Sequence, residues 1–220
     1  INVAAETPEL LELADRTPAV RGVVGWVDLT DAAVADRIAE LRALPGGERL
    51  VGVRHQGQNE DDAEWLLREQ VLRGLAIVAQ SGLAFDLLVR PVQLPAAIEA
   101  VRRVPAGRFI LDHLGKPDIA TGRIEPWGSQ IRELAAQDNV ACKLSGLVTE
   151  ATASWTVDSL EPFGQAAGHL YADIEHGLGP DHANDDPDDA TQQRQKHGFD
   201  QKLCQHIAFP CAQRTPHTNF

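Results

Sequence analysis

RFILDHLG, residues 108–115, is the stretch that decides the fold, because its apolar core Phe109–Leu111 ends directly in Asp112 and His113. The apolar residues are consecutive and do not alternate with polar ones, which is typical of a parallel strand covered on both faces. Four other runs share this character: GVVGWVDL at 22–29, LVGVRHQ at 50–56, AFDLLVR at 84–90 and VACKLSGL at 140–147. The sequence therefore predicts five parallel strands.

Segments with apolar residues at helical spacing separate these runs. Thr7, followed by Pro8, is expected to cap the first helix, and Thr30 or Asp31 is expected to cap the second. Helices are expected, after the first, at 30–44, 65–80, 94–104 and 127–136. The runs start about 30 residues apart, the length of a right-handed βαβ unit. Polar residues at the C-terminal end of every run favour a (β/α)8 TIM-type barrel over an open doubly wound sheet.

The alternation of strands and helices stops after Phe163. Residues 171–220 include DDPDD and TQQRQKHG, and six of the eight histidines lie from His169 onward. Such a composition cannot bury enough apolar surface to offset chain entropy. We predict a partial barrel over 1–165 and a disordered tail over 166–220, joined by a frame change or a chimeric junction. Four possible zinc ligands in the tail are read as accidental because their spacing fits no usual zinc motif: Cys204, His206, Cys211 and His217.

Composition excludes several partners. The net charge of −12 argues against nucleic acid and against an anionic membrane, since both are bound through surplus Lys and Arg. No apolar run has the length of a membrane span, and the N-terminus lacks the features of a signal peptide. Three cysteines are too few for a disulfide scaffold, which favours a reducing cytoplasm. The sequence does not determine the oligomeric state.

Three of the strand runs, together with CKLSGLVTEA at 142–151, carry a family resemblance: GVVGWVDL at 22–29, LVGVRHQ at 50–56 and FILDHLGKP at 109–117. In this order they resemble the amidohydrolase-2 family, in particular its metal-dependent TIM-barrel hydrolases similar to fuconolactonases and rhamnonolactonases. The similarity runs from about Ile1 to about Phe163. It implies that the chain acts on a small molecule, hydrolysing the ester bond in the lactone of a sugar acid or a dicarboxylate.

The family pattern also includes two motifs that this sequence does not contain. They are a His-x-His pair in the first strand and a Gly-Ser-Asp-Trp-Pro-like run in the last, whose Asp is the expected general base. Ile1–Ala4 would then end the second strand, leaving about five full strands and a stub. Loss of two neighbouring strands would open the barrel and expose unpaired edges. We therefore expect an N-terminally truncated, inactive chain.

His113 is the expected catalytic residue. At the C-terminal end of a barrel strand it can ligate a metal or polarise a lactone carbonyl, and the resemblance favours these roles over a purely structural one. Arg54 and His55 end another strand, and because adjacent strand residues point to opposite faces, only one of them can face the barrel axis. Arg54 would bind substrate oxygens through its guanidinium, whereas His55 would donate a hydrogen bond.

Lys143 is expected either to contact substrate or to form a structural ion pair, because an unpaired ammonium inside a barrel is costly. Trp26 is a candidate wall for a sugar ring, with core packing as the alternative. Asp28 is a candidate substrate ligand, with a role in a loop or helix cap as the alternative. Cys142 is expected to be a small core residue and not a nucleophile.

Glu6 follows the strand stub and is a candidate metal ligand with His113, or a residue that stabilises the helix N-terminus. Asp86 and Arg90 are weaker candidates for the same pocket. The resemblance implies either one divalent metal, Zn or Mn, or chemistry without a metal. Two other functions stay open: a metal-dependent decarboxylase of the same superfamily, and a non-catalytic fragment or pseudo-enzyme.

Overall fold

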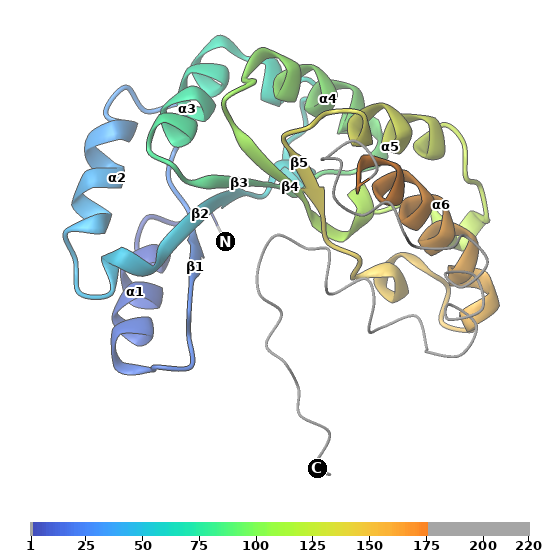
Figure 1. The fold of residues 1–220 in the computed structure, drawn as a ribbon, viewed down its shortest axis with the longest axis horizontal. Helices are drawn as coiled ribbons and strands as arrows, with labels where there is room; N and C mark the ends of the chain where they lie inside the picture. The colour runs from blue at the N-terminus through green and yellow to red at the C-terminus, as the bar shows by residue number, and fades with distance from the viewer. Residues whose placement is uncertain (1, 176–220) are drawn as a thin grey trace.

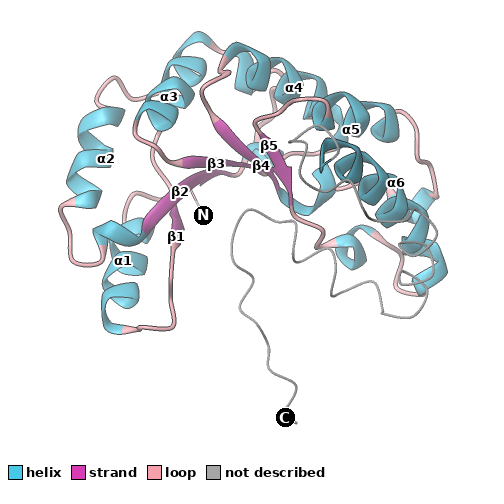
Figure 2. Cartoon of the chain, in the orientation of Figure 1, coloured by secondary structure: helices cyan, strands magenta, loops and turns pink. Residues whose placement is uncertain are grey.

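The computed structural model describes residues 2–175. Five parallel strands form one sheet in the order β1-β2-β3-β4-β5, so that each strand pairs with the next one in sequence. The strands are β1 (Val23–Gly25), β2 (Leu50–His55), β3 (Ala84–Leu87), β4 (Arg108–Leu111) and β5 (Val140–Cys142) (Figure 2). The five strands predicted from the sequence are thus confirmed, although all five are shorter than the predicted runs.

Helices cover the outer side of the curved sheet and follow it as an arc (Figure 1). They are α1 (Glu6–Arg16), α2 (Val34–Arg42), α3 (Glu69–Gln80), α4 (Leu94–Arg103), α5 (Trp127–Ala135) and α6 (Val157–Glu175). The described part is therefore an open segment of an α/β barrel. Within residues 2–175, no helix combines the length and the apolar character needed to cross a bilayer.

The two faces of the sheet differ in chemistry because side chains alternate along each strand. On the inner face, one line of register partners crosses the sheet: Arg54, Asp86, Ile110 and Ala141. Asp112 and Lys143 lie two residues beyond this line on their own chain segments, so the same face continues into charged residues. The inner face is therefore polar at the carboxyl ends of the strands.

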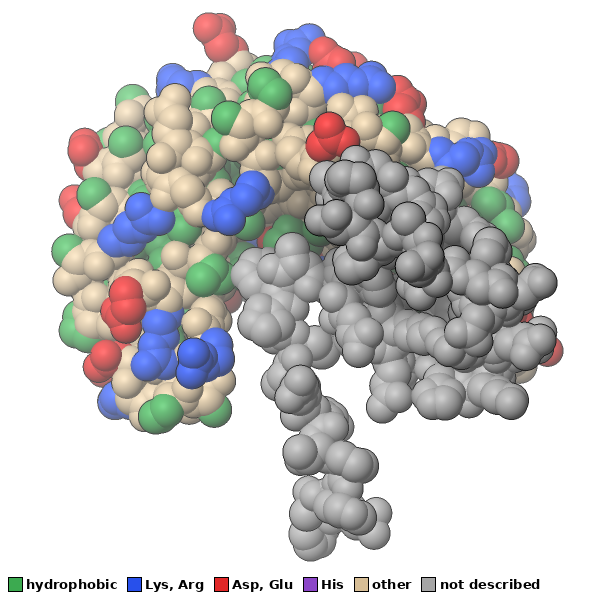
Figure 3. Space-filling view, viewed as in Figure 1, with side chains coloured by type: hydrophobic (Ala, Val, Ile, Leu, Met, Phe, Trp, Pro, Cys, Tyr) green, Lys and Arg blue, Asp and Glu red, His purple; other side chains and the backbone are tan. Residues whose placement is uncertain are grey.

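The outer face carries the apolar core. Its register partners are Val53, Phe85, Phe109 and Val140, all of them buried. The rings of Phe85 and Phe109 meet edge to face, with their centroids 6.4 Å apart. Charges of both signs are interspersed over the helical layer outside this core (Figure 3), and some of them form exposed ion pairs such as Arg102–Glu133.

Two helix caps predicted from the sequence are wrong. The first helix begins at Glu6, with Ala5 in the cap position, and the Thr7 side chain makes no cap. The second begins at Val34, because Asp31 instead accepts a hydrogen bond from the Ala33 amide in the preceding turn. In both cases the side chain expected to cap a helix is used in a different local contact.

Helix α6 was not predicted. At its start, Thr156 and Ser159 exchange side-chain-to-backbone hydrogen bonds, and inside the helix Phe163 packs on Trp127 with ring centroids 5.6 Å apart. The helix crosses the predicted domain boundary at residue 165, which stays a prediction. The predicted zinc-like residues of the tail (Cys204, His206, Cys211 and His217), like most of the predicted disordered tail, lie outside the described residues.

Thr7 joins α1 to the end of β1. Its fully buried hydroxyl accepts a hydrogen bond from the Trp26 amide at 2.7 Å and donates one to the Trp26 carbonyl at 3.0 Å. We expect Thr7→Val to leave both backbone groups unpaired and to lower the free energy of unfolding by about 2 kcal/mol. Urea denaturation measures this change. Thr7→Ser, which keeps the hydroxyl, is the control, and an equal loss in both variants would contradict the prediction.

Candidate active site

Four charged side chains from neighbouring strand ends meet on the inner face of the sheet. The ammonium of Lys143 lies 2.5 Å from Asp86 Oδ2 and 2.6 Å from Asp112 Oδ1. The Arg54 guanidinium lies 3.4 Å from the other Asp112 oxygen. The side chains of both aspartates are 1% exposed, whereas those of Lys143 and Arg54 are 30% and 40% exposed. Two buried carboxylates are thus matched by two partly exposed cations.

Electrostatics keeps the Lys143 amine charged. Burial acts against the ammonium, but the hydrogen bonds to Asp112 and Asp86 outweigh it, so the pKa of Lys143 is raised. Burial also raises the pKa of Asp86, and the hydrogen bond from Lys143 opposes that shift only in part. Lys143 is therefore a fixed cation at neutral pH and is not suited to act as a general base.

The structure decides between Arg54 and His55. Arg54 faces the inner group, whereas His55 is stacked on Trp65 with ring centroids 4.1 Å apart. The Trp26 indole donates to His55 Nδ1 at 3.2 Å, so the proton of the imidazole is on Nε2, which donates to Glu60 at 2.7 Å. His55 thus supports Trp26 and Glu60, and its predicted contact with substrate stays a prediction.

His113 lies in a strained turn directly after Asp112. Four consecutive residues have left-handed backbone angles, with φ of 53° at His113, 55° at Leu114, 66° at Gly115 and 54° at Lys116. For residues other than glycine this conformation costs about 1 kcal/mol each. Strain of this kind persists only where the surroundings impose it, and it is concentrated at functional sites.

Contacts from two elements hold this turn. The buried Trp127 indole, at the start of α5, donates to the Leu114 carbonyl at 2.7 Å. Ser145 Oγ lies 2.8 Å from His113 Nδ1. Next to it, Gly146 leaves room for the imidazole, because a Cβ there would come within 2.8 Å of the same nitrogen. The ring of His113 is thus oriented by the segment that follows β5.

The environment of His113 favours its neutral form. Burial is the largest cause that lowers the pKa of the imidazole, and the charges of Lys116, Lys143 and Arg54 act in the same direction. Asp112 opposes them. A neutral imidazole can donate a hydrogen bond from one nitrogen while the other accepts, so His113 can polarise a carbonyl at neutral pH.

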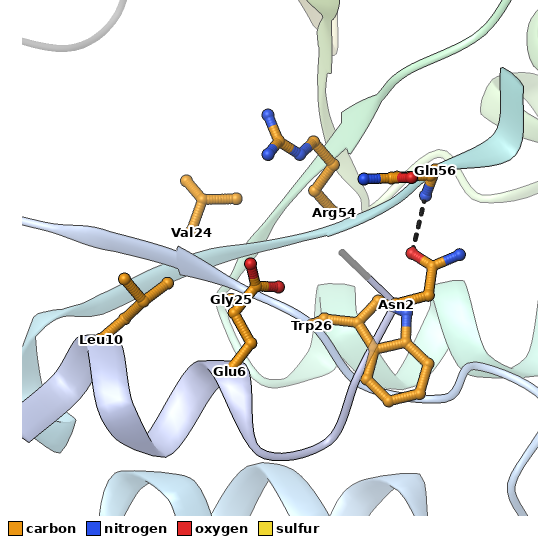
Figure 4. Close-up of a pocket in the computed structure, with 8 residues that line it drawn as sticks. All are labelled: Asn2, Glu6, Leu10, Val24, Gly25, Trp26, Arg54 and Gln56. Atoms are coloured by element: carbon orange, nitrogen blue, oxygen red, sulfur yellow. Dashed lines mark hydrogen bonds between the residues drawn. The ribbon is translucent and has the colours of Figure 1, made fainter.

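A small pocket opens beside Arg54 at the β1 side of the sheet (Figure 4). Its other polar lining residues are Asn2, Glu6, Trp26 and Gln56. Arg54 and Val24 point to the same side of their strands, and Glu6 rises from the first turn of α1. The Gln56 amide donates to the Asn2 side chain at 3.0 Å. Glu6, Trp26 and Arg54 therefore line one pocket, and their roles in a site stay predictions.

The described residues do not fit a metal ion. No group of three or more His, Cys, Asp or Glu side chains within residues 2–175 could hold one. The carboxylates of Asp86 and Asp112 already face the Lys143 ammonium, which occupies the position a cation would need. The predicted metal at His113 and Glu6 stays a prediction.

The remaining candidates lie apart from the charged group or play other roles. Asp28 is exposed and accepts hydrogen bonds from the Thr30 amide and hydroxyl, so it stabilises a local turn. Exposed Arg90 precedes α4, and its amide donates to Gln93. Sequence reasoning singled out neither Asp112 nor Ser145. The alternation of faces from Ile110 to Asp112 was the signal that could have found Asp112.

Comparisons with known proteins agree with this architecture. The amidohydrolase family model matches residues 4–182. The chain is 40% identical over 161 residues to an L-fucono-1,5-lactonase of Burkholderia ambifaria, covering 73% of this chain and 54% of the relative. A second L-fucono-1,5-lactonase, from Burkholderia multivorans, is 41% identical over 152 residues, which is 66% of this chain and 50% of the relative. The chain spans about half the length of these curated relatives.

A crystal structure of a Burkholderia multivorans amidohydrolase with bound zinc resembles this fold with a TM-score of 0.70 and 36% identity. The match covers 78% of this chain and 61% of that one. The α/β-barrel class expected from the sequence is thereby confirmed.

The lowered pKa of His113 predicts how acid affects stability. Because the pKa in the folded state lies below the ordinary value of 6.5, protons bind the unfolded chain more readily. His113 therefore lowers the free energy of unfolding as pH falls below about 6.5, until the folded-state pKa is reached. An NMR titration of the imidazole should give a midpoint below 6.5, and Lys116→Gln should raise it. A wild-type midpoint above 6.5 would contradict this reading.

The indole of Trp127 should be a main support of the strained turn. We expect Trp127→Phe to leave the buried Leu114 carbonyl unpaired and to cost about 1–3 kcal/mol of unfolding free energy. Trp155, which is 43% exposed, provides the matched control, and Trp155→Phe should change stability by less than about 0.5 kcal/mol. Similar losses in both variants, measured by denaturation, would show that the hydrogen bond is not responsible.

Proposed function

This chain belongs to the amidohydrolase family, and on that premise we propose that its site is built to hydrolyse a lactone of a sugar acid or a dicarboxylate. One observation carries the proposal. His113 and Arg54 are linked through Asp112 at the carboxyl ends of parallel strands, inside the region that matches the family model. The two curated relatives that share this region at about 40% identity are named as lactonases.

In the proposed reaction, His113 binds the lactone carbonyl. When Nδ1 accepts from the Ser145 hydroxyl, the neutral imidazole carries its proton on Nε2 and can donate to the carbonyl oxygen. Arg54 supplies N–H groups that orient the polar oxygens of the substrate. Trp26 also lines the pocket, with its indole turned away from Arg54 toward His55 (Figure 4), and its role as a wall for a sugar ring stays a prediction.

The hydrolytic step balances with water alone. A water oxygen adds to the carbonyl carbon, negative charge develops on the carbonyl oxygen beside His113, and collapse of the tetrahedral intermediate breaks the ring C–O bond. The products are a hydroxyl group and a carboxylate. The base that takes the proton of water is, by family resemblance, the Asp of a motif that this sequence does not contain. We therefore propose that the chain by itself turns over slowly or not at all.

An assay of acid release from aldonolactones tests this function. The chain alone, and the chain extended by the first- and last-strand segments of the Burkholderia ambifaria relative, are compared with spontaneous hydrolysis. We expect turnover in the extended form, and we expect His113→Asn to lower kcat by about 100-fold through loss of the carbonyl donor. Arg102→Met, in an exposed ion pair on the helical layer, is the control. If the extended form hydrolyses no aldonolactone, the proposal fails.

A further inference from the structure

The segment that follows β5 contacts the strained turn and the residues beside it through Lys143, Ser145 and Glu150. Its backbone amide donates to the Leu111 carbonyl at 2.9 Å, so strand-like pairing continues up to the residue before Asp112. Two residues later, Ser145 contacts His113. Further on, Glu150 accepts from the Lys116 ammonium at 3.1 Å. The segment thus contacts the chain at both ends of the turn.

The contact between the buried carboxylates of Asp86 and Asp112 depends on Lys143. Among the described residues, its ammonium is the one hydrogen-bond donor to the Asp86 carboxylate, whose other oxygen is buried without a partner. The same ammonium lies 2.6 Å from Asp112. Asp86 is on β3, Asp112 follows β4 and Lys143 follows β5, so one charge ties three neighbouring strand ends together.

We propose that Lys143 is a positioning residue: by holding Asp112 against Asp86 it fixes the left-handed turn 113–116 and so the direction of the His113 imidazole. The inference deepens the proposed function and rests on it for its catalytic part. The ammonium donates a hydrogen bond to Asp86 and forms a 2.6 Å ion pair with Asp112, so two carboxylates already balance its charge. A lysine whose charge is already balanced by two aspartates would attract a substrate anion only weakly. A lysine that holds the two aspartates together has to contact both of them.

The alternative is that Lys143 binds substrate directly, and the two roles predict different measurements. A positioning residue affects the geometry of the turn in the absence of any ligand, and it affects kcat more than KM, because a misplaced catalytic group weakens the transition state selectively. A substrate ligand affects KM and leaves the free turn unchanged.

Backbone NMR of the full chain gives the first readout. Chemical shifts and amide–Hα couplings of residues 113–116 report their positive φ angles without any substrate. We expect Lys143→Met to remove this signature, Lys143→Arg to retain it, and Arg102→Met to leave it unchanged. Loss of the ammonium leaves two buried carboxylates, so Lys143→Met can fail to fold. In that case Asp86→Asn/Lys143→Met, which removes one of those charges, replaces it.

Lactone hydrolysis gives the second readout. In the extended form, we expect the methionine variant to lose about 100-fold in kcat with KM changed by less than about twofold, and Lys143→Arg to recover most of kcat. A folded methionine variant that keeps the wild-type signals at residues 113–116, or one that loses activity only through KM, overturns the proposal. If the extended form without a substitution at Lys143 shows no turnover, the proposed function fails, while the NMR result still decides whether Lys143 positions the turn.

Discussion

The ion pairs of one lysine with two buried aspartates are the interaction on which the rest of the site depends. A buried carboxylate without a partner costs several kcal/mol, and here Asp86 and Asp112 lie on adjacent strand ends where they would also repel each other. The Lys143 ammonium removes both problems because it contacts both groups at once. Neighbouring strands can therefore end in charged residues whose side chains are buried side by side.

Buried ion pairs of this kind are not the arrangement that stabilises a sheet most. Well-packed apolar residues usually serve as well as a buried ion pair, or better, so the presence of charge at this position points to function. The strained turn leads to the same conclusion. Three residues other than glycine are held at positive φ after Asp112, although a relaxed turn would cost less. Buried charge and backbone strain are thus both found in the segment that carries His113.

The outer face of the sheet makes this possible. Phe85, Phe109 and their neighbours form a continuous apolar layer beneath the helices, and burial of this layer is a main source of the folding free energy. Trp127 connects the two faces, because its ring is buried with Phe163 while its indole N–H reaches the turn. The stable apolar layer on the outer face thus offsets the free-energy cost of the buried charges and the strained turn on the inner face.

The sequence by itself determined the five strands, five of the helices and the position of His113, because these follow from continuous apolar runs, helical spacing and the residue that ends each run. It could not choose between Arg54 and His55, since alternation within a run that is apolar on both faces leaves no visible pattern. Helix α6 was also missed, because Pro162 interrupts its pattern and its support comes from Trp127. Only the tertiary structure brought Asp86, Asp112 and Lys143 together: their contacts depend on the register between strands, which no local stretch of sequence encodes.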